Sequence, residues 1–238
     1  MRVAILQPMY IPWMGYFGLI GNVDVFVFLD DAQFEKQSWQ NRNRIKTPSG
    51  PQWLTIPVHY SFGQHIREVK VDSRGHWRKD HRKAFQFNYA KASFFREYQE
   101  LLERMFDSPG DSLAGFTVHG IRLLCEALGI RTPLRFSSEF GVRASKTARL
   151  CSLLKKIGAT EYVSGPAAKE YLDTASLHRQ GIKVYWWEYA VPEYPQLFGA
   201  FVSHLTVLDL LLNAGPESGK YLSQGSSAAL VGDSFPSA

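Results

Sequence analysis

The sequence has few cysteines, no long apolar run and only a small excess of one charge. Its two cysteines, Cys125 and Cys151, fall inside apolar helical patterns and lack metal-ligand spacing to another cysteine or histidine. This argues against a zinc site and favours two buried thiols in a reducing compartment. No stretch reaches bilayer-spanning length, and residues 1–6 lack the apolar run of a signal peptide. We therefore expect a cytoplasmic protein with no membrane partner.

The composition is that of a folded protein with a sizeable core. Of the 238 residues, 45% are hydrophobic and 21% are charged, and the net charge is +5. The positive charge favours anionic partners such as phosphates, nucleotides or nucleic acid. We expect a single α/β domain over residues 1–222, with a helical insertion at about 76–130. Residues 223–238 are rich in Ser, Gly and Ala and are predicted to form a disordered tail.

Alternating strand and helix patterns predict the fold class. Residues 2–6 and 25–29 are apolar strands, and the helix expected from 12 to 20 lies between them, which is typical of a parallel sheet. Further strands are expected at 52–58, 66–71, 134–136, 161–164 and 183–188. Further helices are expected within 76–106, and at 113–128, 148–157 and 198–213. The pattern predicts a Rossmann-like, mostly parallel sheet with flanking helices.

Residues 7–17 (QPMYIPWMGYF) connect the first strand to the first helix. Ligands of open α/β sheets bind at the carboxyl ends of strands, where a helix N-terminus offers free N–H groups to an anion. Gln7 can hydrogen-bond a substrate, and Tyr10, Trp13 and Tyr16 offer flat faces to a base or a sugar ring. The alternative is that these aromatics form a hydrophobic wedge under the sheet edge.

Two carboxylates, Asp30 and Asp31, follow the second strand, and Gln33 comes shortly after them. Such a pair can act as a general base, a magnesium ligand or an anchor for an amine. The competing interpretation is a solvated strand end with an Asx turn.

The alternating segment 39–46 comes next. If extended, it places Asn41 and Asn43 on one face and the cationic side chains on the other; these are Arg42, Arg44 and Lys46. The cationic face would hold an anionic substrate, unless the segment is a plain exposed hairpin.

Residues 76–83 form the most basic stretch, which would suit tRNA or a diphosphate but is also typical of a solvated helix face. His81 is its candidate catalytic residue, and His204, in the apolar 198–213 segment, is another. Polar side chains on short loops complete the candidate binding set; they are Ser164, Gly165, Tyr171, Asp173, Tyr194 and Gln196. Asp209 is more simply explained as a buried residue with partners.

Several of these segments, in this order, resemble the WbqC-like family. The motifs are residues 7–17, 24–34, 39–46, 53–58, 162–165, 171–173, 194–196 and 201–215, so that only the tail is uncovered. The resemblance implies an enzyme of glycan (O-antigen) or specialised-metabolite biosynthesis. It further implies transfer of an acyl or aminoacyl group, such as glycyl.

A looser resemblance concerns the fold alone. Residues 12–16 are similar in placement to the His-x-Gly-His turn of nucleotidylyltransferases and pantothenate synthetases, but Trp13 and Tyr16 replace both histidines. An aromatic side chain cannot supply the positive charge that stabilises a phosphoryl transition state. Adenylyl transfer by that mechanism is therefore not expected, even if the fold is shared.

Our leading hypothesis is a transferase that moves an acyl or aminoacyl group to an amine or hydroxyl of a sugar-like, anionic or nucleotide-activated acceptor. In it Asp30 or Asp31 deprotonates the acceptor, and Arg42 and Arg44 hold its phosphate or carboxylate. The donor is an ATP-activated acid, with magnesium, or an aminoacyl-tRNA; no protein metal site is expected. Two alternatives stay open: an ATP-using ligase that activates a carboxylate, and a non-catalytic module that binds nucleic acid or carbohydrate.

Overall fold

A mostly parallel sheet organises the structure, a computed structural model that describes residues 1–144, 146–226 and 230–232. Within these ranges the sheet has the strand order β10-β9-β8-β1-β2-β7, in which only β10 is antiparallel to its neighbour. Its strands are β1 (Arg2–Leu6), β2 (Val25–Phe28), β7 (Leu134–Phe136), β8 (Glu161–Ser164), β9 (Lys183–Trp187) and β10 (Leu230–Gly232). In this order β1 lies between β8 and β2. The chain continues from β1 to β2 on one side of the sheet centre and from β8 to β9 on the other.

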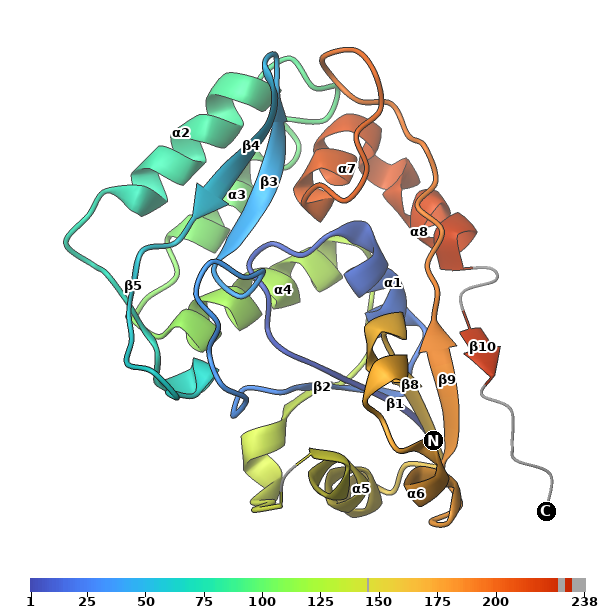
Figure 1. The fold of residues 1–238 in the computed structure, drawn as a ribbon. Coiled ribbons are helices and arrows are strands. Elements are labelled where there is room, and N and C mark those ends of the chain that lie inside the picture. The colour runs from blue at the N-terminus through green and yellow to red at the C-terminus, as the bar shows by residue number, and fades with distance from the viewer. Residues whose placement is uncertain (145, 227–229, 233–238) are drawn as a thin grey trace.

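The strands are apolar on both faces because helices cover both faces of the sheet. Ala4 and Phe26 point into the larger apolar cluster, and Val3 and Val27 point into a second one on the opposite face. The larger cluster includes side chains of α1 (Met14–Gly21), α4 (Leu113–Ala127), α7 (Val207–Ala214) and α8 (Ser218–Ser226). The second includes those of α5 (Lys146–Ile157) and α6 (Thr174–His178). Figure 1 shows these helices on opposite sides of the sheet.

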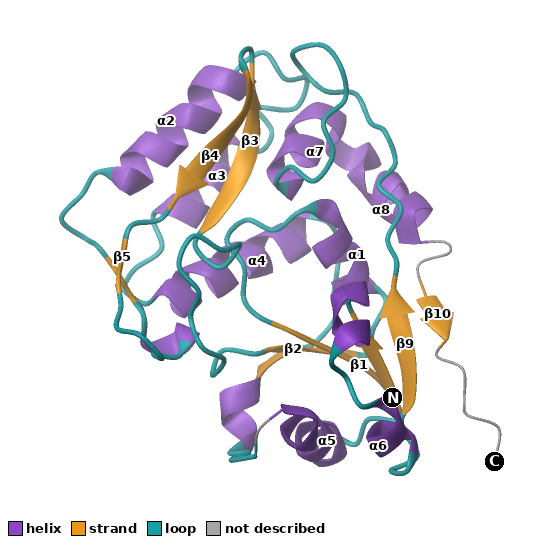
Figure 2. Ribbon diagram, in the orientation of Figure 1, coloured by secondary structure: helices purple, strands orange, loops and turns teal. Residues whose placement is uncertain are grey.

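Two hairpins and two helices extend the larger cluster beyond the sheet. The hairpins are β3 (Arg42–Thr47) with β4 (Gly50–Thr55), and β5 (Val58–His59) with β6 (Lys70–Val71). The helices are α2 (Trp77–Tyr89) and α3 (Gln99–Phe106). Short 3₁₀ turns are η1 (Ile66–Glu68), η2 (Ser137–Phe140), η3 (Pro166–Glu170) and η4 (Gly215–Glu217). Figure 2 shows the β3–β4 hairpin standing apart from the central sheet, beside α2 and α7.

The predicted Rossmann-like α/β fold is confirmed, and four predicted elements differ in detail. The 66–71 strand is instead η1 followed by the short strand β6, and the 52–58 strand is divided between β4 and β5. The apolar 198–213 segment is helical only from Val207, because Phe198 and His204 adopt φ values of 66° and 57° that interrupt a helix. Part of the predicted tail is ordered, since α8 continues to Ser226 and 230–232 form β10; residues 227–229 and 233–238 lie outside the described part.

The expectations for the cysteines and for membrane-spanning helices can also be compared with the structure. Both cysteines are buried and free, on α4 and α5. In the described part of the chain, none of the helices combines the length and the apolar character needed to cross a bilayer.

Gly215 ends α7 in a conformation that other residues rarely adopt. Its φ is 54°, and an added Cβ would lie 2.4 Å from the ring of Phe94. We expect Gly215→Ala to lower the free energy of unfolding by about 3 kcal/mol, from backbone strain and overpacking together. Urea denaturation would measure this loss. The control is Gly219→Ala in α8, where no atom lies within 4 Å of the new methyl group. A helical alanine there should be neutral or slightly stabilising, and equal losses in both variants would contradict the prediction.

Candidate functional site

A pocket rich in arginine lies at the carboxyl ends of β2 and β7. Its volume is about 460 Å³, within the range of small-molecule sites. Its lining residues are Asp31, His65, Arg67, Ser138, Gly141, Val142, Arg143, Ala144 and Arg149. They come from four segments of the chain that meet at one edge of the sheet. This is the edge at which open α/β sheets bind ligands.

Hydrogen bonds between two loops build one wall of the pocket. The backbone N–H of Ile66 donates to Ala32 O at 2.9 Å, and that of Arg67 donates to Asp30 O at 2.9 Å. The segment after β2 therefore holds residues 64–67 alongside itself. As a result, His65 and Arg67 stand next to Asp31, although they are more than thirty residues away in sequence.

The two aspartates after β2 have different surroundings. Asp30 is buried, and it accepts hydrogen bonds from Ser137 Oγ at 3.0 Å, Ser138 N at 3.0 Å and Ser138 Oγ at 2.7 Å. These bonds tie the end of β2 to η2 after β7. Asp31 accepts a hydrogen bond from Ser137 and forms an ion pair with Arg149 of α5. Only Asp31 faces the cavity, so Asp30 positions the strand ends and Asp31 is the carboxylate that a ligand can reach.

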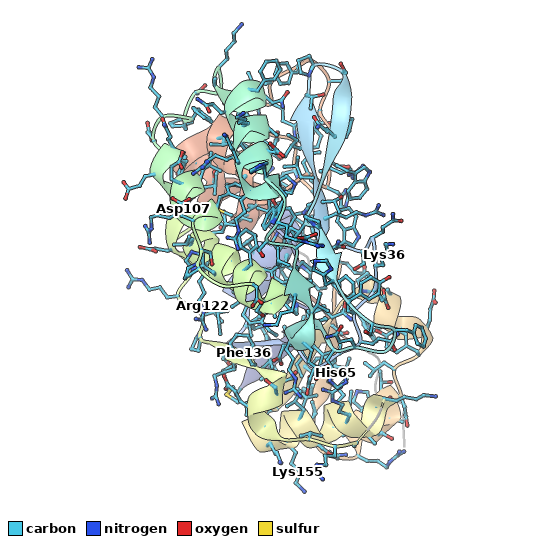
Figure 3. The ribbon with its side chains drawn as sticks, turned by 90° about the vertical axis from the view of Figure 1, so that its left-hand side faces the viewer. Lys36, His65, Asp107, Arg122, Phe136 and Lys155 are labelled. Atoms are coloured by element: carbon cyan, nitrogen blue, oxygen red, sulfur yellow. The ribbon has the colours of Figure 1, made fainter. Side chains whose placement is uncertain are left out.

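Positive charge dominates the pocket. Arg67 is paired only loosely with Glu68, at 3.9 Å, and Arg143 has no ion pair within the described residues. Arg149 carries the ion pair to Asp31, and its side chain keeps 22% of its surface exposed. Three guanidinium groups beside one carboxylate favour a ligand with a phosphate or a carboxylate, because each group offers a planar fork of donors. Figure 3 shows the labelled His65 on the side of the molecule that also carries Lys36.

The aromatic residues of segment 7–17 do not join this pocket. Tyr10 and Tyr16 are buried, and the Tyr16 hydroxyl donates to Gln7 O at 3.0 Å. Their positions fit the aromatic wedge that was the alternative interpretation. Trp13 is partly exposed, and its indole packs against His204 with ring centroids 4.7 Å apart. Gln7 Oε1 accepts a hydrogen bond from Gln40 at 2.9 Å.

The N-terminus of α1, expected to bind an anion, contacts other parts of the protein instead. Val207 N donates to Pro12 O at 2.9 Å, and Trp13 forms a backbone bridge with Thr206. The Trp13 ring also lies so close to Gly15 that an added Cβ would meet it at 2.2 Å. An apolar ring and a neighbouring loop therefore lie beside this helix end. The arrangement does not fit a phosphate at the His-x-Gly-His position of nucleotidylyltransferases.

The side chains of segment 39–46 alternate between two faces, as predicted, and the two faces have different surroundings. Asn41 and Asn43 are buried; Asn43 Nδ2 donates to Tyr10 O at 3.1 Å and to Ile11 O at 2.6 Å. Arg42 and Arg44 lie on the outer face, partly exposed. Lys46, on the same strand face, is buried because the loop 196–202 covers it. Its ammonium group donates to Gln196 Oε1 at 3.0 Å and to Ala200 O at 2.6 Å.

The other predicted site residues are spread over the molecule. Gln33 is exposed and forms a backbone bridge with His65. Ser164 is buried and accepts a hydrogen bond from Tyr162, and Gly165 begins η3. Tyr171 is 76% exposed, and Asp173 is the N-cap of α6. Tyr194 is buried and donates to Asp209 at 2.9 Å. The predicted set therefore does not form one cluster, and Asp31 is its only member that lines the arginine pocket.

The comparisons with known proteins agree with this chain's motifs. The model of the WbqC-like protein family matches residues 7–221. The chain belongs to this family. It is also 41% identical over 225 residues to "Uncharacterized protein Rv1507c" of Mycobacterium tuberculosis (strain ATCC 25618 / H37Rv), which covers 93% of this chain and 97% of that protein. No solved structure matches the chain.

The pocket residues of this WbqC-like protein that sequence reasoning missed are His65, Arg67, Ser138, Arg143 and Arg149. None of them belongs to a motif with a defined spacing. The available signal was indirect: both strands that end at the pocket, 25–29 and 134–136, were predicted. That signal covers Ser138 and Arg143, which follow the second of these strands, but not His65, Arg67 or Arg149.

Two histidines were predicted as catalytic, and His81 lies inside the apolar cluster. Its Nδ1 is 2.7 Å from the Tyr10 hydroxyl, and Trp77 packs against its ring with centroids 5.3 Å apart. Burial lowers the pKa of the imidazole to about 4. His204 is exposed, with its Nδ1 2.9 Å from Ser203 Oγ; partial burial, and then the charge of Arg44, lower its pKa. Neither histidine lines the arginine pocket.

The low pKa of His81 predicts a loss of stability in acid. The unfolded chain binds a proton at His81 below pH about 6.5, whereas the folded chain binds it only near pH 4. Stability therefore falls as the pH drops through this window. We expect the wild type to lose about 2 kcal/mol more than His81→Gln between pH 7.5 and 5, by urea denaturation. His76→Gln, at the exposed N-cap of α2, should keep the wild-type profile; a wild-type slope in His81→Gln would refute this account.

Proposed function

We propose that this protein is a transferase whose small anionic substrate is held by phosphate or carboxylate in the arginine pocket. The observation that carries the proposal is the convergence of Arg67, Arg143 and Arg149 on one cavity at the carboxyl edge of the sheet. The cavity is large enough for the charged part of a nucleotide-activated sugar or a similar building block. Glycan or specialised-metabolite biosynthesis is the setting that membership of the WbqC-like family suggests.

The proposed reaction moves an acyl or aminoacyl group, glycyl included, to an amine or hydroxyl of a sugar-like acceptor. The acceptor nitrogen or oxygen attacks the donor carbonyl carbon, and a new amide or ester bond forms. The bond between that carbon and the donor's leaving oxygen breaks, and the leaving group departs with the electron pair. Asp31 is the proposed acceptor of the proton that the attacking group loses, because it is the carboxylate that lines the pocket. The arginines orient the anionic end of the substrate.

Binding is the first test of this proposal. Isothermal titration with phosphate, pyrophosphate, uridine diphosphate and a uridine diphosphate amino sugar should give the tightest binding for ligands with two adjacent phosphates. Failure of all four to bind at millimolar concentration would contradict the proposed site.

Turnover is the second test. The same acceptors would be incubated with radiolabelled glycine, supplied either with ATP or as glycyl-tRNA. Transfer with release of pyrophosphate from ATP would instead support the alternative, an ATP-using ligase. The arrangement around Trp13 and Gly15 argues against that alternative.

A further inference from the structure

The outer face of the β3–β4 hairpin, together with the segment just before β3, carries neighbouring tryptophan and arginine side chains. Trp39 and Trp53 are each 42% exposed, and their ring centroids are 5.3 Å apart. The Arg42 guanidinium lies 4.3 Å from the Trp53 ring centroid. The Arg44 guanidinium lies 5.6 Å from the Trp53 centroid and 5.9 Å from that of Trp39. We call these four side chains the hairpin face.

The two arginines of the hairpin face have unused binding capacity. Within the described residues, the Arg42 and Arg44 side chains make neither a hydrogen bond nor an ion pair, and both Nε atoms are buried without a partner. Lys46, two residues further along β3 than Arg44, shows the contrast, because Gln196 and Ala200 accept its hydrogen bonds. The indole rings thus hold two guanidinium groups in place by cation–π contacts while their terminal nitrogens stay free.

The inner side of the hairpin keeps this face rigid. Ile45 and Leu54 are buried in the larger apolar cluster, and Asn41 Nδ2 donates to Ile56 O at 3.0 Å. Lys46 N donates to the Tyr89 hydroxyl at 2.9 Å, which fixes β3 on α2. A partner that binds the outer face therefore does not have to order the backbone, and this lowers the entropic cost of association.

Further aromatic rings lie beyond the hairpin. Thr206 N donates to Arg44 O at 3.1 Å, so the loop that carries His204 runs beside β3. His204 packs against Trp13, and Trp13 packs edge-on against Tyr189 with ring centroids 5.5 Å apart. Aromatic rings therefore lie on both sides of Arg44. The rings, with the arginines between them, offer stacking positions to more than one residue of a bound chain.

We infer that the hairpin face binds a single-stranded nucleic acid, with unpaired bases stacked on Trp39 and Trp53 and phosphates held by Arg42 and Arg44. Proteins that bind single strands combine exposed aromatic rings with cations that follow the backbone. Base pairing hides the faces of the bases, so a duplex offers only its phosphates to this surface. A neutral carbohydrate would also stack on the tryptophans, but it would leave both guanidinium charges without an anionic partner. The net charge of +5 supports a polyanionic partner.

The inference does not depend on the proposed transferase activity. The hairpin face and the arginine pocket share no residue. The labelled Lys36, three residues before Trp39, and the labelled His65 of the pocket lie on the same side of the molecule in Figure 3.

Fluorescence anisotropy with a labelled 12-nucleotide single-stranded RNA, and with its duplex, tests the inference at 50 and 200 mM salt. We expect Trp53→Ala to weaken binding of the single strand about tenfold, through loss of one stacking platform. Arg44→Ala should reduce the slope of log K against log salt by about 0.7, through loss of one phosphate contact. The duplex should bind more weakly than the single strand, and Trp53→Ala should change its affinity little.

Matched controls are available elsewhere on the surface. Phe62→Ala removes an aromatic side chain that is 96% exposed in the loop after β5, and Arg131→Ala removes an exposed cation before β7; neither should change binding. Trp53→Phe keeps a smaller stacking ring and should fall between wild type and Trp53→Ala, which covers the case of a poorly folded alanine variant. Equal binding by wild type and Trp53→Ala would overturn the inference. Equal losses of single-strand and duplex affinity in Trp53→Ala would also overturn it. Tighter binding of an acidic polysaccharide than of the single-stranded RNA would do the same.

Discussion

Replacing Arg149 with alanine is expected to weaken pyrophosphate binding about 100-fold. The Arg149 side chain reaches from α5 into the pocket and contacts Asp31, so it is held in place before a ligand arrives. A preorganised guanidinium that makes two parallel hydrogen bonds to an anion contributes more than a mobile surface cation. Removing it also leaves the negative charge of Asp31 without its ion-pair partner, which repels an incoming anion. Isothermal titration calorimetry at low salt measures the change.

Two controls separate this effect from general loss of positive charge. Arg149→Lys keeps the charge but not the planar fork, and it should recover only part of the affinity. Lys155→Ala removes an exposed cation from the same helix and should leave the affinity within about twofold of wild type. Equal weakening by Lys155→Ala and Arg149→Ala would show that the anion responds to overall charge, and the pocket would then not be its site.

Asp31→Asn is expected to change the pyrophosphate affinity in the opposite direction, measured by the same titration. Loss of the carboxylate removes a repulsive charge and frees Arg149, so pyrophosphate should bind more tightly, by up to about tenfold. Transfer to an acceptor should nevertheless fall, because the amide cannot take the proton. A variant that binds the anion better but transfers more slowly would separate the two roles assigned to the pocket. Weaker anion binding by Asp31→Asn would mean that Asp31 organises the arginines.

The five parallel strands of the sheet could be predicted from the sequence because they are short, apolar and separated by helical patterns, whereas β10 lies in the stretch that was predicted to be a disordered tail. Residues 2–6, 134–136 and 161–164 were predicted with the bounds that the structure has, and 25–29 and 183–188 differ by one residue at their ends. The two faces of β3 also followed from the alternation of its side chains. Local patterns are sufficient for such features, because burial on both faces gives a short continuous apolar run and burial on one face selects every second residue.

The site could not be predicted in the same way, because contacts between distant segments build it. Nothing local indicates that residues 64–67 pair with the segment after β2, or that Arg149 reaches Asp31 from α5. Tyr10 and Tyr16 left two interpretations open, because an aromatic residue beside proline and glutamine suits a binding loop and a wedge equally well. Here the partly buried Gln7–Gln40 hydrogen bond and the buried hydrogen bonds of Asn43 satisfy the polar groups around them, and the rings enter the core.

The helix predicted at 198–213 was too long for a related reason. The segment 198–206 is apolar, but Gln196 fixes it as a loop: Val202 N donates to Gln196 Oε1 at 2.9 Å, and Gln196 Nε2 donates to Val202 O at 3.0 Å. Thr206 then caps the helix, so that α7 begins at Val207. A side chain that binds both backbone groups of another residue competes with the helix, and hydropathy alone does not reveal it.

Asp209→Ala is expected to cost about 4 kcal/mol of the free energy of unfolding. Asp209 is fully buried in α7, and burial raises the pKa of its carboxyl group. It accepts hydrogen bonds from the Tyr89 hydroxyl at 2.7 Å and from the Tyr194 hydroxyl at 2.9 Å. Alanine would leave both hydroxyls buried without an acceptor, at about 1–3 kcal/mol each. Urea denaturation measures the loss. Asp173→Ala, which removes an exposed N-cap, should cost only about 1 kcal/mol.

A double-mutant cycle with Tyr194→Phe tests the cause of that loss. If unsatisfied hydroxyls produce it, Asp209→Ala should cost less in the Tyr194→Phe background, because one of the two donors is already gone. Additive costs would point to a packing defect instead. The remaining donor also joins the network to the hairpin, since Lys46 N donates to the Tyr89 hydroxyl that Asp209 orients. Amide exchange at Lys46 should therefore accelerate in Asp209→Ala by more than the global loss of stability requires, because β3 loses a fixed partner on the side opposite Trp53 and Arg44.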